Sequence, residues 1–117
     1  MNITYLGKQI EIRMTPAAGR ALAQRSVPLL AEMELLFSCL IRKRVLFSER
    51  QDQTAVPVND WLNVSFRPVM TETCLLSGIE EPVPVTAFPI ANPRPFIPRW
   101  LHLDYRRNQW YGEFGYQ

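Results

Sequence analysis

Residues 100–115 alternate between two kinds of side chain on either side of a polar turn at Arg107-Asn108. With the turn centred there, one face of a two-stranded ladder collects Leu101, Leu103, Tyr105, Trp110, Gly112 and Phe114. The other face collects Trp100, His102, Asp104, Arg106, Tyr111 and Glu113. Because a slip of one residue would exchange the faces, their agreement in one register predicts a C-terminal β-hairpin. We expect its apolar face to be buried, and Asp104 and Glu113 to be exposed.

The N-terminal part of the sequence predicts a second hairpin and a helix. Apolar and polar residues alternate over residues 3–12, which indicates two short strands around a turn at Gly7-Lys8. Thr15 followed by Pro16 is typical of a helix start, since the hydroxyl caps the first turn and proline suits the first helical position. We expect one short helix after Thr15.

Residues 29–47 fit two patterns. A helix would carry an apolar stripe of Leu29, Met33, Leu36, Phe37, Leu40 and Ile41. A strand would carry an apolar face, interrupted by Lys43, of Leu35, Phe37, Cys39, Ile41, Val45 and Phe47. We interpret the segment as a strand, because this pattern also accounts for residues 45–47 and gives the next strand a neighbour. For residues 29–43 both structures remain open.

The middle of the chain predicts a loop, a strand and an extended segment. Residues 48–60 are polar and indicate an exposed loop. Residues 62–70 alternate clearly, but Pro68 cannot donate to a β ladder, so we expect it at an edge, a bulge or a break. Residues 77–98 contain six prolines and predict an extended, irregular segment over the surface. The apolar residues expected to anchor it are Phe88, Ile90, Phe96 and Ile97.

Length and composition favour one folded domain. The chain has 117 residues, of which 47% are hydrophobic and 21% charged, the balance of a globular protein. We therefore expect a single globular domain over residues 1–117. Its predicted fold class is α+β: a mainly antiparallel sheet with an N-terminal hairpin, one short helix and a C-terminal hairpin.

The sequence carries neither a secretory signal nor an apolar stretch long enough to span a bilayer. Two cysteines, Cys39 and Cys74, are too few for a disulfide framework. We expect a cytoplasmic protein without membrane association, in which both thiols are reduced and buried.

The charged residues argue weakly for a nucleic-acid partner. The net charge is only +2, although eleven of the thirteen basic residues are arginine. The arginine bias has two explanations, recognition of phosphate or carboxylate groups and a G+C-rich genome. A nucleic-acid-binding surface would combine the aromatic residues Trp100 and Tyr111 with several basic residues. These are Arg42, Lys43, Arg44, Arg94, Arg99, Arg106 and Arg107. Because the chain is far less basic than typical binders, we expect nucleic acid to be an unlikely partner, though one not excluded.

One cluster has the residue types for acid–base or metal chemistry. The hairpin register places His102 opposite Glu113, with Asp104 two residues along on the same face. An imidazole beside carboxylates is able to bind a divalent metal or transfer protons. The alternative, which we favour, is a solvated cross-strand pair, since no metal-ligand spacing accompanies the histidine. The glycines form no phosphate loop, and no serine lies in a nucleophile elbow, so we predict no cofactor and no metal.

No motif in the sequence identifies an activity. The absence of catalytic motifs and the aromatic and arginine residues around Trp100 favour a non-enzymatic module that binds another protein or assembles with itself. We expect Trp100, Arg99, Arg106 and Tyr111 to form its contact surface. The alternatives are a metal-binding protein or small enzyme that uses His102, Asp104 and Glu113, and a weak nucleic-acid binder that uses surface arginines.

Overall fold

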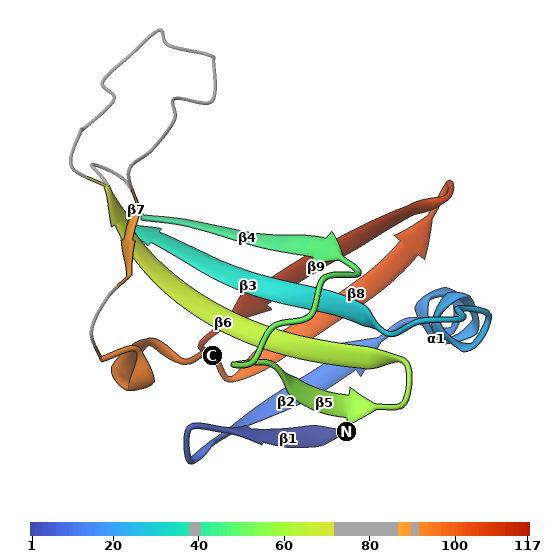
Figure 1. The fold of residues 1–117 in the computed structure, drawn as a ribbon, viewed down its shortest axis with the longest axis horizontal. Helices are drawn as coiled ribbons and strands as arrows, with labels where there is room; N and C mark the ends of the chain where they lie inside the picture. The colour runs from blue at the N-terminus through green and yellow to red at the C-terminus, as the bar shows by residue number, and fades with distance from the viewer. Residues whose placement is uncertain (38–40, 72–86, 90–91) are drawn as a thin grey trace, which may run out of the picture.

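A computed structural model describes residues 1–37, 41–71, 87–89 and 92–117 (Figure 1). In this part of the chain the strands form two sheets. Sheet A has the order β1 (Asn2–Tyr5), β2 (Lys8–Met14), β8 (Trp100–Arg106) and β9 (Gln109–Gly115). Sheet B has the order β4 (Ile41–Ser48), β3 (Leu29–Phe37), β6 (Leu62–Thr71) and β5 (Val56–Asn59), and β7 (Ala87–Pro89) also pairs with β6.

Both sheets are mixed, which corrects the prediction of a mainly antiparallel sheet within a fold that is broadly α+β. In sheet A the antiparallel pairs β1–β2 and β8–β9 flank the parallel pair β2–β8. In sheet B the antiparallel pairs β3–β4 and β5–β6 flank the parallel pair β3–β6. The chain leaves sheet A after β2, forms sheet B, and returns with β8, so the inner strands of each sheet run in the same direction.

The two predicted hairpins are confirmed. In the C-terminal hairpin Leu101 pairs with Phe114 and His102 with Glu113, and both turn residues have positive φ, 53° at Arg107 and 63° at Asn108. The N-terminal turn is displaced by one residue from the predicted position. It centres on Leu6 and Gly7, with φ of 49° and 82°, because a two-residue hairpin turn needs positive φ at both central positions.

Helix α1 (Pro16–Ala23) begins where the sequence predicts it. The Thr15 hydroxyl accepts a hydrogen bond from the backbone N–H of Ala18 at 3.1 Å, which satisfies one of the free donors of the first turn. Ala18 and Leu22 are buried against the sheets. The helix lies at the end of the structure where β2 ends and β3 begins (Figure 1).

Residues 29–37 and 41–47 are extended, as the strand pattern predicts, but they form two paired strands, β3 and β4. Residues 48–60 are not wholly a loop, which corrects the prediction of an exposed loop there. Residues 56–59 form β5, in which Val56 pairs with Val64 of β6. This short strand contains Pro57 and polar neighbours, so it lacks a clear alternating pattern.

The core lies between the two sheets. Alternate side chains of β1, β2, β3, β6, β8 and β9 contribute to it, and the fully buried residues include Ile10, Met33, Leu62, Val64, Leu101 and Leu103. Burying one side chain of this size stabilises a fold by roughly 1.5–3 kcal/mol. On the predicted apolar face of the C-terminal hairpin, Phe114 is buried as expected, whereas Tyr105 and Trp110 are only half-buried because they lie near the hairpin turn.

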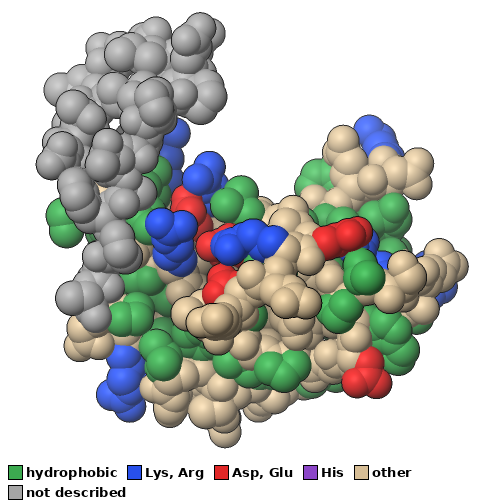
Figure 2. All heavy atoms as spheres, viewed as in Figure 1, with side chains coloured by type: hydrophobic (Ala, Val, Ile, Leu, Met, Phe, Trp, Pro, Cys, Tyr) green, Lys and Arg blue, Asp and Glu red, His purple; other side chains and the backbone are tan. Residues whose placement is uncertain are grey.

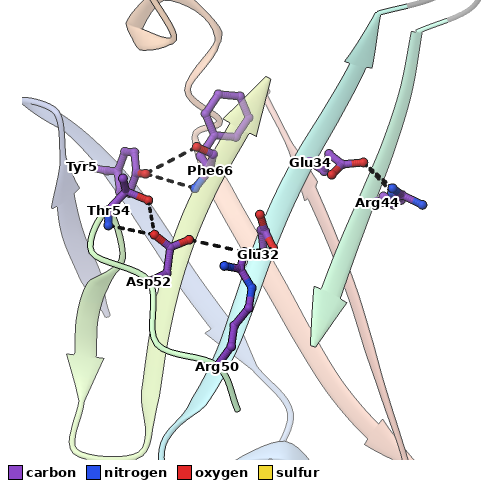
Figure 3. Close-up of polar contacts among 8 residues, drawn as sticks. All are labelled: Tyr5, Glu32, Glu34, Arg44, Arg50, Asp52, Thr54 and Phe66. Carbon is purple, nitrogen blue, oxygen red and sulfur yellow. Dashed lines mark hydrogen bonds and ion pairs between the residues drawn. The ribbon is translucent and has the colours of Figure 1, made fainter. Parts of the chain in front are cut away.

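The edges of the two sheets meet on both sides. On one side β9 approaches β4 so closely that a Cβ atom at Gly112 would lie 2.9 Å from Cζ of Phe47. On the other side the Tyr5 hydroxyl donates to the carbonyl of Phe66 at 3.4 Å and accepts from its N–H at 3.2 Å (Figure 3). This hydroxyl fills the gap along β6 between β5 and β7. Backbone N–H groups two residues apart in a strand point to the same side, so the nitrogen of Pro68, which has no hydrogen, faces the same edge as the N–H of Phe66. This agrees with the predicted edge position of Pro68.

The proline-rich segment is described only in part. Residues 94–96 form a short 3-10 helix, η1 (Arg94–Phe96), and the following Ile97 is buried. The Phe96 ring packs against Phe37 with 5.2 Å between ring centroids. The predicted anchors Phe88 and Ile90, and the thiols of Cys39 and Cys74, lie outside the residues whose side chains the structure describes. In the described part of the chain, no helix has both the length and the apolar character needed to cross a membrane.

Candidate functional site

The outer face of sheet A carries the predicted contact residues. Leu101 and Leu103 point into the core, so the alternate residues of β8 point outward, and those of β2 and β9 follow the same alternation. The residues that share this face are Glu11, Arg13, Trp100, His102, Asp104, Arg106, Tyr111 and Glu113. We call this surface the aromatic–arginine face.

Trp100 lies flat on the aromatic–arginine face because its partner across the ladder is Gly115. A Cβ atom at Gly115 would lie 2.4 Å from Cζ2 of the indole ring, so only glycine leaves room for the ring there. The guanidinium carbon of Arg13 lies 5.3 Å from the ring centroid, within the range of a cation–π contact. Arg13 is in turn held by an ion pair of 2.6 Å to Glu11. The indole is therefore held in position by the sheet.

A second arginine packs on an aromatic ring at the hairpin end of this face. The guanidinium carbon of Arg106 lies 4.4 Å from the centroid of Tyr111, and its Nε lies 2.9 Å from Oδ2 of Asp104. Tyr111 is also fixed by donating its hydroxyl hydrogen to Gln109 at 3.0 Å. The Arg99 side chain is exposed at the residue before β8, but in the strand alternation it shares the parity of Leu101 and not that of Trp100.

Asp104 is half-buried, not exposed as the sequence analysis expected. Its Oδ1 accepts hydrogen bonds from the Thr15 hydroxyl at 2.7 Å and from the N–H of Tyr105 at 2.8 Å. The hydrogen bond from Thr15, with smaller contributions from the Tyr105 amide and Arg106, lowers the pKa of Asp104. Because the Thr15 hydroxyl also caps α1, it links the helix to β8.

The predicted acid–base cluster is assembled in part. His102 and Glu113 are direct partners across the ladder, as predicted. Asp104 lies on the same face, but both of its oxygens are engaged by Thr15, Tyr105 and Arg106. Among the residues that the structure describes, no three histidine, cysteine or acidic side chains are arranged to hold a metal ion.

The basic residues of the predicted nucleic-acid surface do not form one surface. The run at residues 42–44 is divided, as expected for a strand: Lys43 donates to the carbonyl of Phe114 at 3.2 Å, while Arg44 points to the opposite face. Arg94 contacts a third element, donating to the carbonyl of Leu6 at 3.1 Å.

A second polar arrangement lies on the outer face of sheet B, where the sequence analysis proposed no site. Glu32 and Glu34 point outward from β3, because the intervening Met33 points into the core. Acidic and basic side chains gather across the middle of this face (Figure 2). Both glutamate side chains are only 8% exposed. The segment that joins β4 to β5 contacts Glu32 through Arg50, whereas Glu34 lies between its register partners Arg44 of β4 and Arg67 of β6. We call residues 49–55 the strap.

Each buried glutamate is paired with an arginine (Figure 3). Two nitrogens of Arg44, Nε at 2.7 Å and Nη2 at 2.6 Å, contact one oxygen of Glu34. Arg50 of the strap contacts Glu32 at 2.8 Å through Nη2, and this hydrogen bond raises the pKa of Arg50. Arg50 also lies 3.5 Å from Asp52, whose pKa is lowered chiefly by hydrogen bonds from Thr54.

Ser65 completes this arrangement. It is the register partner of Glu32 on the neighbouring strand β6, so both side chains lie on the same face. Ser65 is 1% exposed, and its hydroxyl has no hydrogen-bond partner among the described residues. We call Glu32, Glu34 and Ser65 the buried polar row.

One signal in the sequence indicates the buried polar row. Glu32 and Glu34 are two residues apart in an otherwise apolar segment, so a strand places both on one face beside Leu30 and Leu36. Carboxylates in such a position need cationic partners. The apolar pattern of residues 29–47 alone does not reveal these acids.

Comparison with known proteins adds no constraint. No protein family, characterised protein or solved structure matches this chain. The aromatic–arginine face and the buried polar row therefore carry the functional argument by themselves.

Proposed function

We propose that this chain is a non-enzymatic binding module that contacts another protein through the aromatic–arginine face. The position of Trp100 carries the proposal: the ring lies over Gly115, and Arg13 lies over the ring. Tryptophan, tyrosine and arginine are the residue types that contribute most to binding at protein interfaces. A ring that is already fixed loses little conformational freedom on binding, which favours affinity.

The charges on this face support a protein partner over a nucleic acid. Arg13 is paired with Glu11, and Arg106 is paired with Asp104. A phosphate backbone is bound by cations that displace its counterions, and acids beside those cations oppose such binding. A protein surface of mixed charge is complementary to paired charges around an aromatic centre.

The alternative function, a metal or acid–base centre at His102, Asp104 and Glu113, requires a rearrangement. Asp104 would have to release Thr15 and Arg106 before it could bind a metal or accept a proton from a substrate. A zinc ion also needs at least three well-aimed protein ligands.

The test compares Trp100→Ala with Trp61→Ala. Trp61 is the matched control, because it is 40% exposed but lies between β5 and β6, on the other sheet. Each variant is immobilised and incubated with extract of the source cells, and the retained proteins are identified by mass spectrometry. We expect a partner that wild type and Trp61→Ala retain and that Trp100→Ala loses. Gly115→Ala should also lose it, because the new Cβ displaces the indole ring.

Other results would contradict the proposal. Equal retention by all variants would show that the aromatic–arginine face is not the interface. Sedimentation showing a dimer of wild type that Trp100→Ala disrupts would identify a second copy as the partner. A divalent ion that co-purifies in stoichiometric amount and is lost in His102→Ala would support the metal centre instead.

A further inference from the structure

The strap covers the Glu32 end of the buried polar row. Strands β4 and β5 lie at opposite sides of sheet B, so the chain between them has to cross β3 and β6 (Figure 1). Residues buried on the outer face of sheet B include Leu30, Glu32 and Ser65, at 2%, 6% and 1% exposure. An outer sheet face is normally open to solvent, so these values reflect the cover.

Ion pairs join the strap to the described residues around it. Its sequence, Glu49 to Ala55, contains no large apolar side chain that could anchor it in the core. The ion pairs are Arg50–Glu32 and Arg25–Glu49, in which Arg50 is 53% and Glu49 64% exposed. The pair Arg25–Glu49, with its solvated glutamate, contributes little to stability. Glu32 is buried and needs a cation, so the strap separates from the sheet when another cation takes the place of Arg50 on Glu32.

The Ser65 hydroxyl shows that Arg50 does not satisfy the buried polar row completely. A buried hydroxyl without a hydrogen bond is unfavourable, and native structures rarely keep one. Arg50 reaches Glu32 through a single nitrogen, whereas Arg44 contacts Glu34 through two. A guanidinium group has five donors in a planar fork and can serve a carboxylate and a hydroxyl together.

We propose that Glu32 and Ser65 form a binding site for an arginine side chain of a partner protein, and that Arg50 occupies this site in the unbound molecule. This site lies on the sheet opposite the aromatic–arginine face and does not depend on it. The incoming guanidinium replaces Arg50 on Glu32 and uses the unpaired Ser65 hydroxyl as a second acceptor. Arg50 is thus an internal competitor that keeps the site closed.

The surrounding charges require replacement of Arg50 and not addition beside it. Glu34 is already paired with Arg44, and Asp52 is near both Arg50 and Arg67. A second cation next to Arg50 would meet repulsion from Arg44 and Arg67. After Arg50 leaves, the incoming group restores the same local charge.

The experiment uses a fluorescein-labelled peptide with two arginines in a glycine–serine background, and measures its binding by fluorescence anisotropy at low ionic strength. Arg50→Gln removes the competing cation. We expect this variant to bind the peptide about tenfold more tightly than wild type. This is the gain for a wild-type site that Arg50 leaves open about a tenth of the time. Arg20→Gln changes the net charge equally at an exposed position of α1, outside both proposed sites, and should bind like wild type.

Two further variants locate the site. Adding Glu32→Gln or Ser65→Ala to Arg50→Gln should remove the gain in affinity. Tighter binding that persists in both double variants would overturn the proposal, as would equal binding by Arg50→Gln and wild type. A peptide with lysine in place of arginine should bind more weakly, because an ammonium group lacks the planar fork.

A measurement on wild type does not depend on how the variants fold. Hydrogen exchange of the strap amides is followed with and without saturating arginine peptide. Displacement of Arg50 should speed exchange at residues 49–55 while β3 and β6 stay protected. Unchanged exchange in the strap under saturation would contradict the proposed competition.

Discussion

The outer faces of the two sheets use the same chemistry in different surroundings. On sheet A the pair Arg13–Glu11 is about equally exposed on both sides, with side-chain exposures of 50% and 49%. On sheet B the arginine of the pair Arg44–Glu34 is 59% exposed but the glutamate only 8%. A carboxylate in water needs no partner, whereas a buried one does. An Arg–Glu ion pair therefore adds little to stability on the outer face of sheet A and is needed for stability on the outer face of sheet B.

The connections between strands and the neighbours of each glutamate account for this difference. In sheet A each antiparallel pair is joined by a two-residue turn, so its outer side chains stay half-buried or exposed. In sheet B the outer strands β4 and β5 are joined by the strap, which crosses the face and excludes water from β3. Burial of Glu32 is therefore a consequence of topology, whereas Glu34 lies between Arg44 and Arg67 on the two flanking strands.

The largest expected effect is on the pair Arg44–Glu34. Arg44→Ala should lower the free energy of unfolding by about 3 kcal/mol, because it leaves a buried carboxylate without its cation. Urea unfolding followed by tryptophan fluorescence measures the change. Arg42→Ala is the control, since Arg42 lies on the same face of β4 opposite the apolar Leu36. Equal effects of the two substitutions would show that burial does not distinguish the faces.

An intermediate effect is expected at the link between α1 and sheet A. Thr15→Val should lower the free energy of unfolding by about 1–2 kcal/mol, because it removes the helix cap and the hydrogen bond to Asp104. Thr15→Ser keeps the hydroxyl and should behave like wild type. A loss as large in Thr15→Ser would assign the effect to the methyl group and not to the hydrogen bonds.

This effect should depend on pH. The pKa of Asp104 is lowered in the folded state, so its charged form stabilises the fold above the ordinary carboxyl pKa, and this stabilisation is lost as the pH falls through the folded pKa. Thr15→Val raises that pKa and removes part of the stabilisation. Its difference from wild type should therefore be larger at about pH 7 than at about pH 3. A difference that grows on acidification would contradict this assignment.

The smallest effect is expected at the exposed pair of sheet A. Glu11→Ala should change the free energy of unfolding by no more than about 0.5 kcal/mol, because the pair is solvated. Arg13 remains over the Trp100 ring without it. A loss comparable to that of Arg44→Ala would remove the contrast between the two faces.

Local patterns in the sequence predicted the elements that depend on neighbouring residues. The register of the C-terminal hairpin follows from alternation around Arg107-Asn108, and the start of α1 follows from Thr15-Pro16. The outward position of Trp100 and His102 follows from the same alternation. In these cases the interacting residues lie within one segment, so the sequence contains both partners.

Contacts between distant segments had no such signal. The parallel pairing of Ile12 with Leu101 joins residues that belong to different predicted elements. The contact between Thr15 and Asp104 depends on this pairing, so the half-buried position of Asp104 could not be predicted either. Likewise, Glu32 and Arg50 meet only because the strap crosses sheet B. Periodicity describes which face a residue occupies, but not what covers that face.

The parallel pairing of β2 with β8 also determines when the fold can be completed during synthesis. Strand β2 leaves the ribosome early, but its inner neighbour β8 follows only after the whole of sheet B. Until then the core side of β3, including Ala31, Met33 and Leu35, has no opposing sheet. Because translation adds residues far more slowly than hairpins form, the growing chain presents this apolar surface for seconds. We expect chaperones to recognise that surface until β8 enters its place between β2 and β9.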